Sequence, residues 1–155
     1  MVFGFMWRKY GVFGCAVTKP VYNSTYQPIE IESAAKGVTI AHTTPYNCKI
    51  LGEAQGKDDA TQKDVASVDK VRDGALNDLK NNALAVAGSG KRIMLSITNE
   101  EAQCTAFFVQ KKFFGLSQKL YKKDVDCTKG YSGATWLQPL TYTVKAQIFE
   151  CGNKD

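Results

Sequence analysis

The stretch that decides the fold is VASVDKVRDGALNDLKNNALAVAGSGKRIMLSIT, residues 65–98. Its apolar residues recur at steps of three and four: Val65, Val68, Val71, Ala75, Leu79 and Ala83. This spacing predicts an amphipathic helix over residues 61–87, with Gly74 as a mild interior weakness. The glycines at 88 and 90 end the helix. In residues 91–98, Ile93, Leu95 and Ile97 alternate with Met94, Ser96 and Thr98, which predicts a half-buried strand.

Further strands are predicted on both sides of this unit. Residues 38–44 are rich in β-branched side chains and stop at Pro45, and residues 47–54 and 141–151 also have strand character. Residues 56–60, GKDDA, predict a turn before the helix, and residues 129–138 predict a loop covered by Trp136. Residues 105–112 and 113–122 predict a hairpin that turns near Gly115. Together these elements predict an α+β fold, a small mostly antiparallel or mixed sheet with one main helix packed on one face.

Composition limits the class of protein. The 155 residues are 44% hydrophobic and 23% charged, as expected for a single globular domain with its own core. The net charge of +5 comes from 20 basic and 15 acidic residues, a mild excess without the clustering of a dedicated nucleic-acid binder. We therefore expect no nucleic-acid partner. The sequence contains no run of eighteen apolar residues that would span a bilayer as a helix.

The amino-terminal residues suggest a lipid anchor. Residues 12–15, VFGC, resemble the lipobox of bacterial lipoproteins, although Phe13 is bulkier than usual there. We interpret residues 1–14 as a weak signal segment, Cys15 as the lipidated residue and residues 15–37 as an extended tether. One acyl chain would be a marginal anchor, so this interpretation requires more than one. The alternative is an amphipathic amino-terminal helix with a free thiol at Cys15.

The other four cysteines are compatible with export. They are Cys48, Cys104, Cys127 and Cys151. None of them forms a Cys-x-x-Cys pair and His42 is the sole histidine, so we expect neither a zinc site nor another cofactor. Two disulfides are expected in an exported protein, and buried free thiols are the alternative in a reducing cytosol. Four cysteines allow three pairings, among which sequence alone does not choose.

No motif predicts catalysis. Residues 85–92, AVAGSGKR, resemble a phosphate loop in part, but Ala85 and Arg92 stand where that motif needs glycine and serine or threonine. A helix is also expected before the glycines and a strand after them, which is the reverse of a phosphate loop. One histidine and scattered carboxylates give no recognisable catalytic spacing. We therefore predict that the protein is not an enzyme.

Several short motifs resemble a known family. They are NCKILGE at residues 47–53, DLKNNA at residues 78–83, the junction over residues 88–95 and a last strand that ends at Cys151. The chain resembles small bacterial envelope lipoprotein domains related to the stress sensor RcsF over about residues 38–99 and 141–151. The resemblance implies a small α+β domain in the periplasm, usually held at the outer membrane, with no known enzymatic activity.

The resemblance leaves residues 100–140 as an apparent insertion in a single domain of residues 38–155. We predict a Cys104–Cys127 disulfide that closes this segment, and a Cys48–Cys151 disulfide that joins a strand start to the chain end. The segment also contains a possible binding set, in which lysines and aromatic residues alternate: Lys111, Lys112, Phe113, Phe114, Lys122 and Lys123. These side chains could contact an anionic surface, or the lysines could only protect an edge strand from aggregation.

Two classes of function follow. The first is a non-enzymatic envelope lipoprotein that acts as a sensor or assembly accessory, binds an envelope protein or an anionic envelope polymer, and touches the outer membrane from the periplasm through its lipid anchor. The second is a secreted or periplasmic ligand-binding protein or enzyme with its site in residues 100–140. We favour the first because no catalytic pattern lies in that segment.

Overall fold

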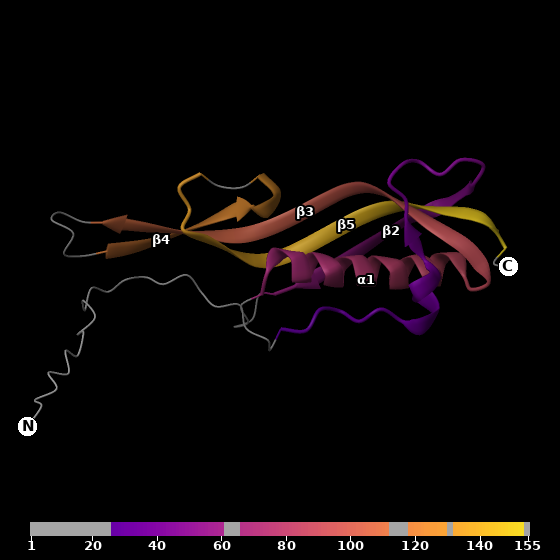
Figure 1. Ribbon diagram of the computed structural model, residues 1–155, viewed down its shortest axis with the longest axis horizontal. Helices are drawn as coiled ribbons and strands as arrows, with labels where there is room; N and C mark the ends of the chain where they lie inside the picture. Colours follow the sequence, from indigo (N-terminus) through magenta and orange to yellow (C-terminus); the bar gives the residue numbers. More distant parts are fainter. Residues whose placement is uncertain (1–25, 61–65, 112–117, 130–131, 154–155) are drawn as a thin grey trace, which may run out of the picture.

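One five-stranded sheet carries a single long helix along one of its faces (Figure 1). The computed structural model describes residues 26–60, 66–111, 118–129 and 132–153. The elements follow one another as η1 (Ser33–Gly37), β1 (Thr39–Ile40), β2 (Lys49–Asp59), α1 (Val68–Ala87), β3 (Lys91–Lys111), β4 (Gln118–Asp126), η3 (Cys127–Lys129) and β5 (Trp136–Asn153). This arrangement confirms the predicted α+β class.

The sheet is mixed and has its longest strands at its centre. Its order is β1-β3-β5-β2, and β4 also pairs with β3. β1 is parallel to β3, whereas the β2–β5, β3–β5 and β3–β4 pairs are antiparallel. β3 and β5 pair from Lys91 with Asn153 to Phe107 with Trp136. These two strands therefore form the spine on which the other elements are arranged.

The helix begins at a side-chain cap. Ser67 Oγ accepts a hydrogen bond of 3.2 Å from the backbone N–H of Lys70, and Asp69 lies in the first turn, where a negative charge is favoured. At the other end Gly88 has a φ of 78°, a value that residues with a side chain rarely adopt. The predicted start at residue 61 is wrong, because residues 66–67 are not helical, and residues 61–65 lie outside the described part of the chain.

The core lies between α1 and the sheet. The predicted stripe is buried, with Val71, Ala75, Leu79 and Ala83 all fully inaccessible to solvent. It packs in one cluster with inward-facing residues of the two central strands: Ile93, Leu95, Val144, Ala146 and Ile148. Burial of this apolar area is the main source of stability.

The expected turn at residues 56–60 is wrong, because Lys57, Asp58 and Asp59 continue strand β2. Gly56 is buried under α1, and a Cβ there would overlap the backbone of Ala75 and Leu79. Glycine at this position lets the helix lie directly on the strand. Contacts with the helix, which are distant in sequence, thus override the local turn preference of GKDDA.

Other predicted boundaries also change. The strand expected over residues 38–44 is only Thr39–Ile40 and leaves His42 exposed outside it. The strand expected over residues 91–98 continues to residue 111, and the closing strand begins at Trp136, inside the expected loop. The limits near residues 100 and 140 thus fall within two continuous strands. In the structure, both ends of this segment are therefore continuous with the central strands.

The tether prediction needs a correction over residues 26–37. Residues 15–25 lie outside the described part of the chain, but Tyr26 is 5% exposed and Ala35 is fully buried. Helix α1 holds this segment through Asn77, whose Nδ2 donates to Ile29 O at 2.9 Å, and through Asn81, which bonds Glu30 O and the Glu32 N–H. In Figure 1 the segment runs along α1 on the side away from the sheet. It is part of the folded domain because these bonds satisfy its backbone.

Among the described residues, no helix has the length and apolar character required to cross a membrane.

Candidate interaction surface

The most individual part of the molecule is a projection that we call the arm, residues 103–111 and 118–129. Here β3 pairs with β4 from Gln103 with Asp126 to Lys111 with Gln118. The antiparallel pairing of the two segments agrees with the predicted hairpin, and the turn predicted near Gly115 lies outside the described residues. β5 joins β3 only as far as Phe107, so the end of the arm has two strands. Figure 1 shows the arm extending beyond the amino-terminal end of α1.

The base of the arm is held by a disulfide and a stacked aromatic pair. Cys104 and Cys127 are bonded, with their Cα atoms 5.3 Å apart. The rings of Phe107 and Trp136 stack with centroids 4.9 Å apart and planes inclined by 14°, and each residue is 8% exposed. Lys122 Nζ lies 5.6 Å from the centroid of the Phe107 ring. Such contacts fix the direction in which the arm leaves the sheet.

The second disulfide lies at the opposite end of the sheet. Cys48, just before β2, is bonded to Cys151 near the end of β5, with their Cα atoms 4.5 Å apart. Together with the Cys104–Cys127 bond, this is the pairing that we predicted from sequence. Each bridge joins a central strand to a residue next to the end of a neighbouring strand: Cys48 directly precedes β2, and Cys127 directly follows β4.

The structure places only part of the predicted binding set. Lys122 and Lys123 are exposed on β4, where they lie opposite Phe107 and Ala106 of β3. Because successive residues of a strand point to opposite faces, these two lysines lie on different faces of the arm. Lys111 ends β3, and Lys112, Phe113 and Phe114 lie outside the described residues, as does Cys15.

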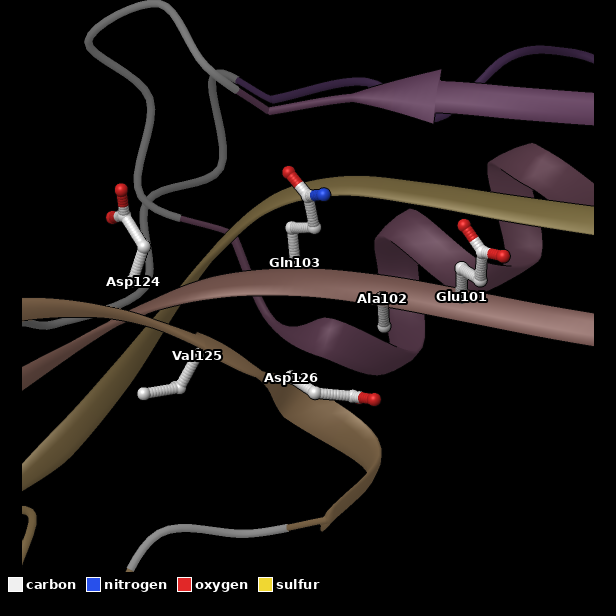
Figure 2. Close-up of a pocket in the computed structure, with 6 residues that line it drawn as sticks. All are labelled: Glu101, Ala102, Gln103, Asp124, Val125 and Asp126. Atoms are coloured by element: carbon white, nitrogen blue, oxygen red, sulfur yellow. The ribbon is translucent and has the colours of Figure 1, made fainter.

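An acidic hollow lies at the junction of β3 and β4. It has a volume of about 610 Å³, and Figure 2 shows its six lining residues, Glu101, Ala102, Gln103, Asp124, Val125 and Asp126. The carboxylates are spread along the hollow and do not turn toward a common point. No group of side chains suited to a metal ion occurs among the described residues. We therefore do not interpret the hollow as a metal site.

Each carboxylate in the hollow accepts a local hydrogen bond. Glu101 Oε1 accepts from Asn99 at 3.0 Å, and Asp124 Oδ1 accepts from the Thr105 hydroxyl at 3.4 Å. Asp126 Oδ1 accepts from the hydroxyl and the backbone N–H of Thr128, which lower the pKa of that carboxyl. None of the three has an ion pair with a described lysine or arginine. The hollow therefore gathers three carboxyl groups without a lysine or arginine among its described lining residues.

A second cavity, of about 600 Å³, lies between the end of β1, helix α1 and β3. Residues 40–44, 96 and 97 line it together with Arg72 and Leu76 of the helix. At its margin Arg72 Nε contacts Glu100 Oε1 at 2.9 Å, and the Tyr142 hydroxyl donates to the same oxygen at 3.2 Å. Burial and the charge of Glu100 raise the pKa of Tyr142. The Arg72 side chain is 39% exposed, so this ion pair is partly open to solvent.

Sequence reasoning missed both hollows. Their lining residues come from elements that are far apart in the chain, and no motif or spacing signals them. Glu101, Asp124 and Asp126 become neighbours because the β3–β4 register sets Gln103 opposite Asp126. A predicted register would have been needed to find them.

Comparisons with known proteins place the chain in a family. No curated protein and no solved structure shows significant similarity to it. A domain of unknown function, DUF4156, matches residues 29–151, which include the segment held on α1, the sheet and the arm. This match covers most of the chain. The chain therefore belongs to the DUF4156 family.

Proposed function

We propose that the protein is a non-enzymatic lipoprotein of the bacterial cell envelope that acts by binding a partner through its arm. The observation that carries this proposal is the arm itself, which extends past the helix and is held at its base by the Cys104–Cys127 disulfide. A projection of this kind increases the surface available for contact without enlarging the core. The partner is an envelope protein or an anionic envelope polymer.

The two disulfides support the proposed location in the periplasm. The domain contains two disulfides, Cys48–Cys151 and Cys104–Cys127, and structural disulfides persist in oxidising compartments such as the periplasm. The VFGC motif at residues 12–15 supports a lipid anchor at Cys15. An anchor and a disulfide-bonded domain together agree with a protein of the outer membrane that faces the periplasm, as the resemblance to RcsF-related lipoproteins implies.

The lysines of the arm support the proposal that the partner is negatively charged. Lys122 and Lys123 are exposed on opposite faces of β4, and Lys111 is the last residue of β3. Lys122 and Lys123 thus place positive charge on both faces of the arm, next to the acidic hollow at its base. Such a surface attracts acidic partners and accelerates their association at low salt.

Replacing the four lysines tests the binding role. A variant with Lys111, Lys112, Lys122 and Lys123 changed to glutamine should bind isolated envelope fractions more weakly than the parent protein at low salt. Raising the salt concentration should weaken binding of the parent protein in the same way. A matched control changes four lysines of the body to glutamine: Lys36, Lys49, Lys70 and Lys145. Equal binding by the arm variant, the control and the parent would show that the arm lysines only protect an edge strand.

Fatty-acid labelling tests the anchor. When cells that express the parent protein are grown with a fatty-acid analogue, the protein should become labelled. The Cys15→Ala variant should not become labelled. Cys15→Ala should also release the protein from the membrane fraction, because a folded domain without acyl chains has no anchor of this type. Equal labelling of both proteins, or of neither, would disprove lipidation at Cys15.

A further inference from the structure

One edge of β3 is open between two neighbouring strands. Along its other edge, β3 pairs with β5 from Lys91 to Phe107. On the open side it pairs with β1 at Met94 and Leu95, and with β4 from Gln103 onward. Residues 96–102 therefore have no strand partner on this side among the residues that the structure describes. A sheet edge of this kind can pair with another extended chain.

The backbone indicates which groups face the open edge. Leu95 O accepts a hydrogen bond of 2.8 Å from the N–H of Ala41, on the side of β1. Because alternate residues of a strand direct their backbone groups to the same edge, Ile97 presents its N–H and C=O on that side as well. These polar groups are strong hydrogen-bonding groups that a partner strand would satisfy.

The gap admits one strand. Residues 96–102 span roughly 20 Å at about 3.3 Å per residue, and β1 and β4 occupy the same neighbouring position at its two ends. The sheet edge of a second folded copy would meet β1 and the arm before it reached β3. This arrangement therefore favours a single extended segment over the edge of a folded copy.

The two hollows lie at the ends of this gap. At the β1 end, the cavity has the apolar side chains of Ile40, Leu76 and Ile97. At the β4 end lies the acidic hollow, whose three carboxylates form no ion pair with a described lysine or arginine, although the charge of Lys129 helps to lower the pKa of Asp126. An added strand would therefore meet, at one end, a cavity whose apolar part is formed by Ile40, Leu76 and Ile97 and whose remaining lining is largely polar, and at the other end a negatively charged site.

We propose that the open edge of β3 binds an extended segment of a partner protein as an added β-strand. An apolar side chain of the segment enters the cavity beside Leu76, and lysine or arginine side chains enter the hollow beside Glu101 and Asp124. Main-chain hydrogen bonds to residues 96–102 supply affinity, and the two hollows supply specificity. The inference deepens the proposed binding function and rests on it, but it requires neither the lipid anchor nor the arm lysines.

Synthetic peptides test the proposal with the full chain and both disulfides intact. The probe is a fluorescent nine-residue peptide of alternating threonine and valine, with leucine near one end and two lysines near the other. A second peptide has the reverse order, because the added strand can run parallel or antiparallel to β3. One of the two should bind, and it should slow amide exchange at residues 96–102. A peptide with glutamates in place of the lysines should bind at least tenfold more weakly.

Charge removal in the hollow provides the second measurement. The triple variant Glu101→Gln, Asp124→Asn and Asp126→Asn should weaken binding of the lysine peptide about tenfold, since each exposed charge pair contributes a small amount. A control with the same change in net charge alters exposed carboxylates outside the hollow: Glu30, Glu32 and Glu53, each to glutamine. This control should bind the peptide as the parent does.

Four outcomes would overturn the proposal. They are binding of neither lysine peptide, equal binding of the glutamate peptide, protection that maps outside residues 96–102, and amides at 96–102 that are already protected in the chain without peptide. The last would mean that the chain itself or a second copy occupies the edge. Failure here is distinguishable from failure of the arm, because the variant lacking the four arm lysines should bind the peptide normally.

Discussion

The carboxylate of Asp58 fills the space in which a side chain at Gly74 would lie. Asp58 belongs to β2 and Gly74 to α1, and a Cβ at Gly74 would overlap the Asp58 side chain. The carboxylate is 7% exposed and accepts hydrogen bonds from the hydroxyl of Tyr26 and from the backbone N–H of Ile29. Asp58 of the sheet can therefore reach Tyr26 and Ile29 of the amino-terminal segment because Gly74 of the helix has no side chain in its path.

This relationship predicts that Gly74→Ala destabilises the protein. Helix propensity alone would favour alanine by about 1 kcal/mol. The added methyl group must instead displace the Asp58 carboxylate or push the helix from the sheet, which costs about 1–3 kcal/mol. Urea unfolding should show a lower midpoint with little change in slope.

A double variant separates the two effects. If the cost arises at Asp58, then Gly74→Ala should destabilise an Asp58→Ala background much less than it destabilises the parent. An increase in stability of the parent on Gly74→Ala would show that the carboxylate moves aside without cost.

Tyr26→Phe should reveal a pH-dependent contribution. Burial raises the pKa of the Tyr26 phenol, and its hydrogen bond to Asp58 and the negative charges of Asp58, Asp59 and Asp73 raise it further. Removing the hydroxyl should cost about 1–3 kcal/mol at neutral pH, because the buried Asp58 loses a donor.

The advantage of Tyr26 should be complete below about pH 10 and should decline above it. In that range the unfolded chain loses the phenol proton while the folded chain retains it, so rising pH favours unfolding by up to about 1.4 kcal/mol per pH unit. Chemical unfolding of both proteins between pH 7 and pH 11 measures the difference. A stability difference that grows above pH 10 would contradict this assignment.

The periodic parts of the fold could be predicted from sequence. The helix stripe from Val71 to Ala83 and the alternation at Ile93 and Leu95 depend on local spacing, and both are buried in the expected manner. The turn at GKDDA could not be predicted correctly, because Gly56 and Asp58 take their roles from α1 and Tyr26. Glycine and aspartate favour a turn when only neighbouring residues are considered. Here they are in a strand, because their contacts are with residues distant in sequence.

The candidate surfaces were predictable to a smaller extent. The lysines at 122 and 123 are visible as a cluster, but their positions on opposite faces follow from the register of β4 on β3. The open edge depends on β1 being two residues long and on β4 starting its pairing at Gln103. Neither the end of β1 nor the start of the β3–β4 pairing is marked by a sequence pattern, because a strand ends where its neighbouring strand no longer pairs with it.

The two disulfides should stabilise the protein to different extents. Cys48 and Cys151 are 103 residues apart, and Cys104 and Cys127 are 23 apart. In the chain-entropy model these loops correspond to about 4.7 and about 3.4 kcal/mol. Replacing both cysteines of the outer pair by alanine should lower the unfolding midpoint more than replacing both of the inner pair. A larger loss from the inner pair would show that the arm stabilises the whole sheet.

The last prediction concerns the aromatic pair that supports the arm. Phe107 on β3 and Trp136 on β5 stack at the point where β5 leaves the arm, and both are largely buried. Trp136→Ala removes a large apolar side chain and should cost about 3–5 kcal/mol. Amide exchange should accelerate first at residues 103–107, whereas the amides of Ile93 and Leu95 should stay slow, because they lie in the core under α1.

A conservative variant at the same position separates stacking from general instability. Trp136→Phe keeps an aromatic ring against Phe107 and should retain most of the protection in the arm. Lys122→Gln removes only the charge above the Phe107 ring, which is worth about 0.5–1 kcal/mol at an exposed site, and should leave exchange nearly unchanged. If Trp136→Ala accelerated exchange equally throughout the sheet, the arm would unfold with the body, and its direction would depend on the core instead of on this aromatic pair.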